Sequence, residues 1–367
     1  MKTRTSTYRL QYLDWLRGLG AVVMLQGHVF HSFLKPELRA GGPYLFSQFM
    51  GGMPPAIFLF LTGITLAFLM DSAERKGLSA GARLQAVWRR AGYLFLLASA
   101  FRLQLWLFAW PSQWTDLLRV DILNCMGFAV AVMSVMAIFS TAERVRLCAA
   151  LGLGIAFASP WISQIGWPAA PALVRAYIIP DYNFFSFFPW AAFLAFGMSA
   201  GSILRLVRED FIERAMQWAA LLGGALVLGV DYFANLPFSI YEKSEFWLNS
   251  PAQVLIKLGV TLLLLAFAFL WTRYGAKPGW SWVRQFGTTS LLVYWVHIEL
   301  VYGRWFWYFK NNLTVAETLV AALLTILLML ALSTAKTYRA VIRSRMIAGL
   351  ATVGWTFEPK PERVPGD

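Results

Sequence analysis

Charge is scarce in this chain. Charged residues make up 14% of its 367 residues, whereas a soluble domain carries about 25%. Cysteine and histidine are also rare, with two and three copies. Because Cys125 and Cys148 both fall in or beside apolar segments, the sequence predicts neither a disulfide framework nor a metal site. These scarcities argue against an ordinary soluble domain, a disulfide-stabilised secreted scaffold and a metalloprotein.

Apolar residues replace the missing charges. Of the chain, 58% is hydrophobic, and the mean hydropathy is +0.56. A helix needs about 20 consecutive apolar residues to cross a bilayer. The sequence therefore predicts an all-α polytopic membrane protein with ten transmembrane helices, near residues 13–34, 45–70, 88–111, 119–140, 145–163, 184–205, 214–234, 253–272, 285–303 and 315–334.

Lysine and arginine are distributed unevenly between those spans. They gather in alternate connections, such as the one that holds Arg75, Lys76 and Arg83, and in both terminal segments. This alternation follows the positive-inside rule and predicts that both termini are cytoplasmic. The net charge of +13 is then a topology signal and an attraction to anionic inner-leaflet lipid, not a sign of nucleic-acid binding. We expect a bacterial inner (plasma) membrane protein.

The sequence predicts one membrane domain and a tail. Residues 1–334 show no internal repeat and no second domain, and the first apolar segment is too long for a signal-peptide core, so we expect it to be retained. Residues 335–367 form a basic cytoplasmic tail, in which Tyr338 to Val353 are expected to form an amphipathic helix on the inner leaflet.

Arg17 and His28 lie within the first apolar stretch. Eleven helical steps separate them, which returns the helix to within roughly 20° and places both side chains on one face about 16 Å apart. Ionisable residues inside a membrane are costly and mark functional sites by default. The alternative interpretation is a histidine at an interfacial helix end beside an arginine that reaches lipid phosphate.

Other polar residues are expected at the depth of His28, in the outer part of the membrane. Arg102 lies more than half-way up the third span, Asp121 and Asn124 begin the fourth on one face, and His297 lies in the ninth. The second span is interrupted by Gly-Gly-Met-Pro-Pro at residues 51–55. If its helix begins at Pro55, the positive N-terminal end points to the same level. The alternative is an ordinary proline kink.

Several stretches resemble one group of proteins. The Arg-x10-His spacing within residues 9–28 is similar to the signature of the family that O-acylates polysaccharides. Residues 58–63, 118–127 and 181–197 are similar to heparan-alpha-glucosaminide N-acetyltransferase and its bacterial relatives, and residues 290–297 to a late segment of both branches. Together, across residues 9–305, they resemble the transmembrane acyltransferase superfamily.

The resemblance implies an enzyme that moves an acyl group, usually acetyl, from cytoplasmic acyl-coenzyme A to a hydroxyl or amine of a sugar or glycan outside. Its partners would be acyl-CoA, that acceptor and membrane lipid, and a homodimer is left open. The outward loop 35–43 is short, so only His31 could take the part of the loop histidine of the heparan enzyme. Following the polysaccharide branch instead, the resemblance assigns the catalytic role to His28, as general base or as nucleophile.

The remaining roles follow from depth. Asp121 or Glu299 would orient the imidazole, and His297 would assist. Asn124, Arg102 or the N-terminus of the helix in the second span would hold the oxyanion. Arg17, with Arg89 or Arg90, would receive the phosphates or pantetheine of the donor, and Arg102 is grouped with these donor-binding residues. No metal is expected.

Each assignment has a competing structural interpretation. Arg17 could pair with Asp14, three residues earlier, and Arg89 and Arg90 could serve topology alone. Asp121 and Asn124 could be a helix N-terminal acid and a satisfied amide. For the whole chain, the rival functions are a transporter or flippase of a polar metabolite or lipid-linked sugar, which would use the same buried charges, and a non-catalytic scaffold or sensor.

Overall fold

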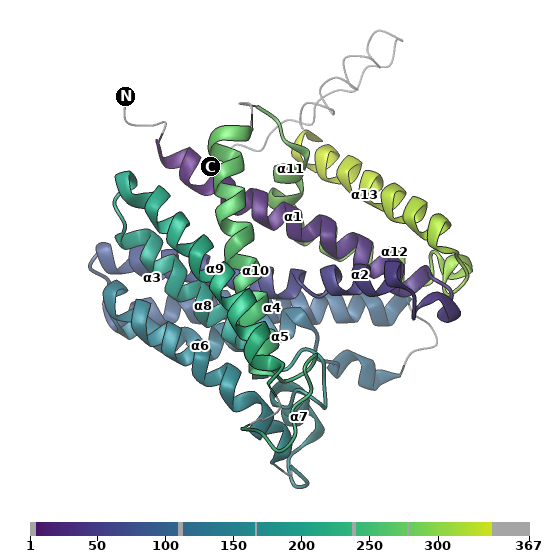
Figure 1. The fold of residues 1–367 in the computed structure, drawn as a ribbon, viewed down its shortest axis with the longest axis horizontal. Helices are drawn as coiled ribbons and strands as arrows, with labels where there is room; N and C mark the ends of the chain where they lie inside the picture. The colour runs from purple at the N-terminus through teal and green to yellow at the C-terminus, as the bar shows by residue number, and fades with distance from the viewer. Residues whose placement is uncertain (1–4, 109–112, 166, 237–239, 277–278, 340–367) are drawn as a thin grey trace, which may run out of the picture.

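A computed structural model describes residues 5–108, 113–165, 167–236, 240–276 and 279–339 (Figure 1). Within these ranges the regular elements are helical, apart from one isolated bridge between Leu34 and Leu313. The α-helices are α1 (Thr5–Phe33), α2 (Gly42–Gly51), α3 (Pro54–Arg75), α4 (Ala80–Phe108), α5 (Ile122–Met133), α6 (Thr141–Gln164), α7 (Ala172–Ile178), α8 (Phe187–Leu206), α9 (Ile212–Ala234), α10 (Pro251–Leu270), α11 (Trp282–Thr288), α12 (Ser290–Tyr302) and α13 (Val315–Thr337).

The all-α polytopic class is confirmed. Within the described residues, eight helical segments are long and apolar enough to cross a membrane, and they contain α3, α4, α5, α6, α8, α9, α10 and α13. The other two predicted spans correspond to α1, which carries Asp14 and Arg17 in its length, and to α11 with α12, which are individually short. The total of ten spans and the side of each terminus remain predictions. The amphipathic helix predicted after Tyr338 lies outside the described residues.

Several predicted spans are not single α-helices in the described residues. The second is divided, because α2 ends at Gly51 and α3 begins at Pro54, where two prolines at the first helical turn lack backbone donors. The ninth is divided between Thr288 and Ser290. The fourth continues beyond Met133 as a tighter 3-10 turn. The short helix α7 was not predicted, because seven residues give too little periodicity.

The core is built around α8, which lies against α3 and α6 (Figure 1). Gly63 of α3 and Gly197 of α8 make this crossing close. A Cβ on Gly197 would lie 2.0 Å from the Phe60 carbonyl oxygen, and one on Gly63 would lie 2.1 Å from that of Leu194. Both glycines fall in stretches that carry the family resemblance, so close helix contact accounts for them.

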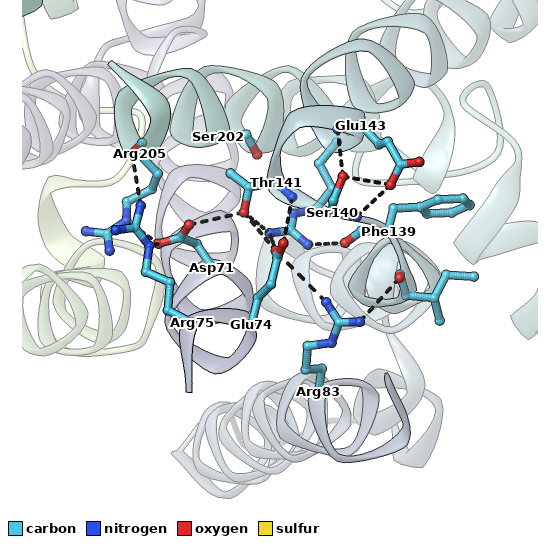
Figure 2. A network of polar contacts seen from close by, with 12 residues as sticks. Asp71, Glu74, Arg75, Arg83, Phe139, Ser140, Thr141, Glu143, Ser202 and Arg205 are labelled. Carbon is cyan, nitrogen blue, oxygen red and sulfur yellow. Dashed lines mark hydrogen bonds and ion pairs between the residues drawn. The ribbon is translucent and has the colours of Figure 1, made fainter. Parts of the chain in front are cut away.

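A polar network joins the ends of α3, α4, α6 and α8 that the sequence predicts to be cytoplasmic (Figure 2). The fully buried Arg144 donates to Glu74 over 2.9 Å, and Thr141 donates to Asp71 over 3.1 Å. Asp71 also pairs with Arg75 and Arg205. Because each buried charge has an opposite partner, the network anchors four helices at the side opposite to His28.

Candidate active site

One large cavity enters the membrane domain. Its volume is about 1520 Å³, and its walls come from α1, α2, α3, α4, α5 and α12. At the predicted cytoplasmic side its lining includes Arg17, Arg90 and Lys336, and at the opposite side Asp116 and Arg119. The cavity therefore extends through most of the thickness of the helical domain.

His28 faces this cavity and has a second histidine behind it. Nδ1 of His28 lies 2.9 Å from Nε2 of His297, and the two ring planes differ by 13°. His297 is fully buried, and its Nδ1 lies 2.7 Å from the Val293 carbonyl oxygen, one turn earlier on α12. The sequence placed both histidines at one depth, and the structure brings them into direct contact.

The third histidine lies one turn farther along α1 and is exposed. Its Nδ1 is 3.2 Å from the Tyr302 hydroxyl, and the Tyr302 ring also stands edge-on to His28, with ring centroids 5.4 Å apart. Tyr302 and His31 both line the cavity. Tyr302 thus contacts two histidines, although the sequence pattern did not predict it as a site residue.

Asp121 and Asn124 have the structural roles that formed the alternative to catalysis. Asp121 caps α5 by accepting from the backbone amides of Leu123 and Asn124 at 3.0 and 3.2 Å, and its other oxygen pairs with Arg102 at 3.0 Å. The Asn124 amide donates to the Tyr177 hydroxyl over 3.3 Å. Asp121 and Arg102 still line the cavity as a paired acid and base, whereas Asn124 is not part of its described lining.

Glu299 does not orient His28 through a described contact. It is buried on α12 and accepts a hydrogen bond from the Trp305 indole over 3.1 Å. Among the described residues, the hydrogen-bond partner of the His28 ring is His297. The expectation that a carboxylate fixes this imidazole therefore has no support in the geometry.

Arg17 lines the cavity and also forms the predicted pair with Asp14, over 2.7 Å. The two interpretations of Arg17 are thus compatible. The pair stands where α1 crosses α11 closely: a Cβ on Gly287 would lie 1.8 Å from the Asp14 carbonyl oxygen, and one on Gly18 would lie 1.8 Å from that of Val283. This crossing holds Arg17 beside the start of α12.

The two adjacent arginines of α4 differ. Arg90 lines the cavity with Tyr93, whose ring lies 5.7 Å from the Arg90 guanidinium carbon. Both side chains are exposed, but Arg89 does not belong to the described lining. Four further residues line the same region and were not predicted as site residues: Lys336, Thr288, Thr289 and Ser290. The break between α11 and α12, where the last three lie, has no proline or glycine pair to mark it.

The interruption of the second span is part of the cavity wall. Gly51, Gly52, Pro54 and Pro55 line it, and α3 begins one residue before the predicted start. Non-helical backbone at membrane depth is tolerated where it faces a cavity, and this segment meets that condition. Behind it lies Lys257 of α10, 9% exposed and 5.0 Å from the Trp190 ring centroid, a buried lysine that the sequence analysis also missed.

The fold and this cavity define an integral membrane protein with a buried histidine site. Comparison with protein families gives a match over residues 9–237 to the family described as heparan-alpha-glucosaminide N-acetyltransferase, catalytic. The chain belongs to this family, and membership indicates a membrane acetyltransferase. The matched region includes Arg17, His28, Arg102 and Asp121, whereas α10 to α13, with His297, follow it. Comparison with curated proteins gives no match.

Proposed function

We propose that the protein transfers an acyl group, acetyl in the simplest case, from cytoplasmic acyl-CoA to a hydroxyl or amine of a sugar on the other side of the membrane. The observation that carries this proposal is one continuous cavity among the described residues. Its lining holds basic residues at one side, His28 in its interior, and Asp116 and Arg119 at the far side. Donor and acceptor can then approach one histidine from opposite directions.

The inner part of the cavity suits coenzyme A. Arg17, Arg90 and Lys336 supply three cationic groups for its phosphates. Eleven residues of α1 separate Arg17 from His28, about 16 Å at the helical rise. A thin pantetheine arm is long enough to cover this distance, so the thioester would reach the imidazole while the phosphates remain among the cations.

Access for the donor lies between α4 and α12. Phe101 and Tyr294 close the gap between these helices with ring centroids 5.3 Å apart. Nearer the predicted cytoplasmic side, Tyr93 of α4 and Leu291 of α12 both line the cavity and are exposed. The two helices therefore contact each other beside His297, and the donor would enter below this contact, nearer the basic residues.

The chemistry requires one proton to be moved. His28 accepts the proton of the acceptor hydroxyl or amine while its oxygen or nitrogen attacks the thioester carbonyl. The tetrahedral intermediate collapses, the carbon–sulfur bond breaks, and the imidazolium returns the proton to the thiolate. Atoms and charge balance without an outside acid. The start of α3, at Pro54 and Pro55, and the Arg102–Asp121 pair are the groups that would face the developing oxyanion.

The acceptor end of the cavity combines polar and aromatic groups. Trp106, Phe184 and Phe185 line it together with Asn183 and Arg119. Flat aromatic surfaces beside hydrogen-bonding groups match the apolar faces and hydroxyl edges of a sugar ring. This composition supports a sugar acceptor over an entirely apolar one.

The test uses the purified full-length protein in detergent with radiolabelled acetyl-CoA and a panel of amino sugars and neutral sugars. We expect saturable donor binding and formation of labelled sugar. His28→Ala should bind the donor and form no product above background. A protein that fails to bind acetyl-CoA, or transfers equally well without His28, would overturn the proposal.

A further inference from the structure

The hydrogen bonds of His297 fix which of its nitrogens carries hydrogen. Its Nδ1 lies 2.7 Å from the carbonyl oxygen of Val293. A carbonyl oxygen can only accept, so Nδ1 is the donor. In a neutral imidazole the other nitrogen is then an acceptor. Because His297 is fully buried on α12, no solvent competes for either position.

The protonation of His297 also determines which nitrogen of His28 carries hydrogen. Nε2 of His297 is the acceptor in the 2.9 Å contact, so Nδ1 of His28 must carry the hydrogen. Neutral His28 consequently has its lone pair on Nε2. The near-coplanar rings, 13° apart, fit an in-plane hydrogen bond between the two imidazoles. His28 lines the cavity and His297 is absent from its described lining, so the edge of His28 away from His297 is the one left for substrate.

We propose that His297 is a positioning residue that, with the Val293 carbonyl as its anchor, locks His28 in the Nδ1–H tautomer and makes Nε2 the basic atom. This inference rests on the proposed function for its catalytic consequence, although the tautomer itself does not. The sequence suggested that His297 assists from a facing helix, and the geometry gives it this specific task.

The arrangement differs from a carboxylate-oriented histidine in one physical respect. A buried carboxylate would bring a charge into the membrane interior at high desolvation cost. His297 supplies the same acceptor geometry while remaining neutral. After proton transfer, His28 as imidazolium still donates through Nδ1 to His297, so the hydrogen bond persists through the reaction.

The experiment exploits the presence of only three histidines. Protein labelled with ¹⁵N in histidine, in a His31→Ala background, leaves two imidazoles to observe by NMR. We expect His28 to carry its hydrogen on Nδ1. In His297→Leu, which removes the acceptor, His28 should lose this preference and shift toward the Nε2–H form. His297→Gln keeps a side-chain acceptor near the position of Nε2 and should restore it.

Transfer kinetics provide the second readout. His297→Leu should lower kcat by about 10²-fold, the scale of misplacing a general base, with the acetyl-CoA dissociation constant unchanged. His297→Gln should recover most of the loss. An Nε2–H tautomer in the parent protein, or an unchanged tautomer in His297→Leu, would overturn the inference. If the tautomer shifts as expected but no variant, including the parent, transfers acetyl, then the proposed function fails and the positioning role of His297 stands.

Discussion

Arg17 and His28 lie on one helix, but different neighbouring residues hold their side chains. Arg17 lies where α1 crosses α11 and is held by Asp14, whereas the His28 ring is held from α12 by His297. Both side chains line one cavity. A change at either position should therefore affect a different step, donor binding at Arg17 and transfer at His28.

Replacing His28 with alanine should remove acyl transfer and leave donor binding nearly intact. A general base contributes about 10² to 10⁴-fold to rate, and it acts only in the transition state. The measurement is the transfer rate and the acetyl-CoA dissociation constant of the purified variant. His31→Ala is the matched control because His31 is exposed and one turn away on the same helix; a larger loss of rate in His31→Ala than in His28→Ala would reverse the assignment.

Replacing Arg17 with alanine should weaken acetyl-CoA binding. A charged hydrogen bond contributes about 1.5–3 kcal/mol, which corresponds to about a 10- to 100-fold weaker affinity. Arg17→Lys should rescue only in part, because the planar two-pronged donor is lost. Arg89→Ala, which changes an arginine outside the described cavity lining, should bind normally. Equal donor affinity in Arg17→Ala and the parent would limit Arg17 to its pair with Asp14.

At the scale of elements, close helix crossings set the positions of the site residues. The crossing of α3 and α8 places backbone against backbone at Gly63 and Gly197. Since α3 begins at the cavity wall and ends in the polar network of Figure 2, this crossing fixes the depth of the interrupted segment. The glycines therefore act on function through helix placement.

Gly197→Ala should destabilise the folded protein by about 1–3 kcal/mol, the usual range for overpacking, because its Cβ would meet the Phe60 carbonyl group. Gly154→Ala in α6 is the control. Apart from the adjoining backbone of α6, no described atom lies within 4 Å of a Cβ there, and alanine should be neutral or stabilising by about 0.5–1 kcal/mol. Thermal unfolding in detergent measures both. Equal melting temperatures for the two variants would contradict a tight crossing at Gly197.

Much of the element plan could be predicted from sequence, because hydropathy and loop charge are local properties. The two helix breaks differ in whether the local sequence predicts them. The one at Gly52 has two glycines and two prolines to mark it, whereas the one at Thr289 depends on packing of α11 against α1 and carries no such signal. For the site residues, too, only some features could be predicted from the sequence. Depth along a helix predicted that His28 and His297 share a level, but their contact requires the rotation of α12, which no spacing within one helix gives.

The polar partners illustrate the same limit. Asp121 was expected to orient an imidazole, and it instead caps α5 and pairs with Arg102. The sequence could predict that Asp121 lies at the start of a helix. It could not predict whether its carboxylate pairs with the His28 imidazole or with the Arg102 guanidinium. Lys257 and Tyr302 were missed because a single lysine or tyrosine in an apolar run has no periodic signature.

For the whole molecule, the side on which each loop lies determines the direction of transfer. The polar network containing Asp71 and Glu74 should face the cytoplasm, and the loop containing Glu242 should face outward. Cysteine introduced at Lys76, which spares the Arg75–Asp71 pair, should resist an impermeant thiol reagent in intact cells, whereas cysteine at Glu242 should react. Native Cys125 and Cys148 are buried and give little background. Labelling at position 76 and not at 242 would invert the topology.

In the proposed function, one cavity carries an acyl group across the membrane by way of His28. The most direct test of this function is transfer in proteoliposomes whose protein orientation has been established by the same labelling, with labelled acetyl-CoA supplied only on the cytoplasmic face and a sugar acceptor only on the other. We expect labelled sugar on the acceptor side, formed at a rate that falls by about 10² to 10⁴-fold in His28→Ala. Product formed only when donor and acceptor share one side, or formed equally by His28→Ala, would contradict it.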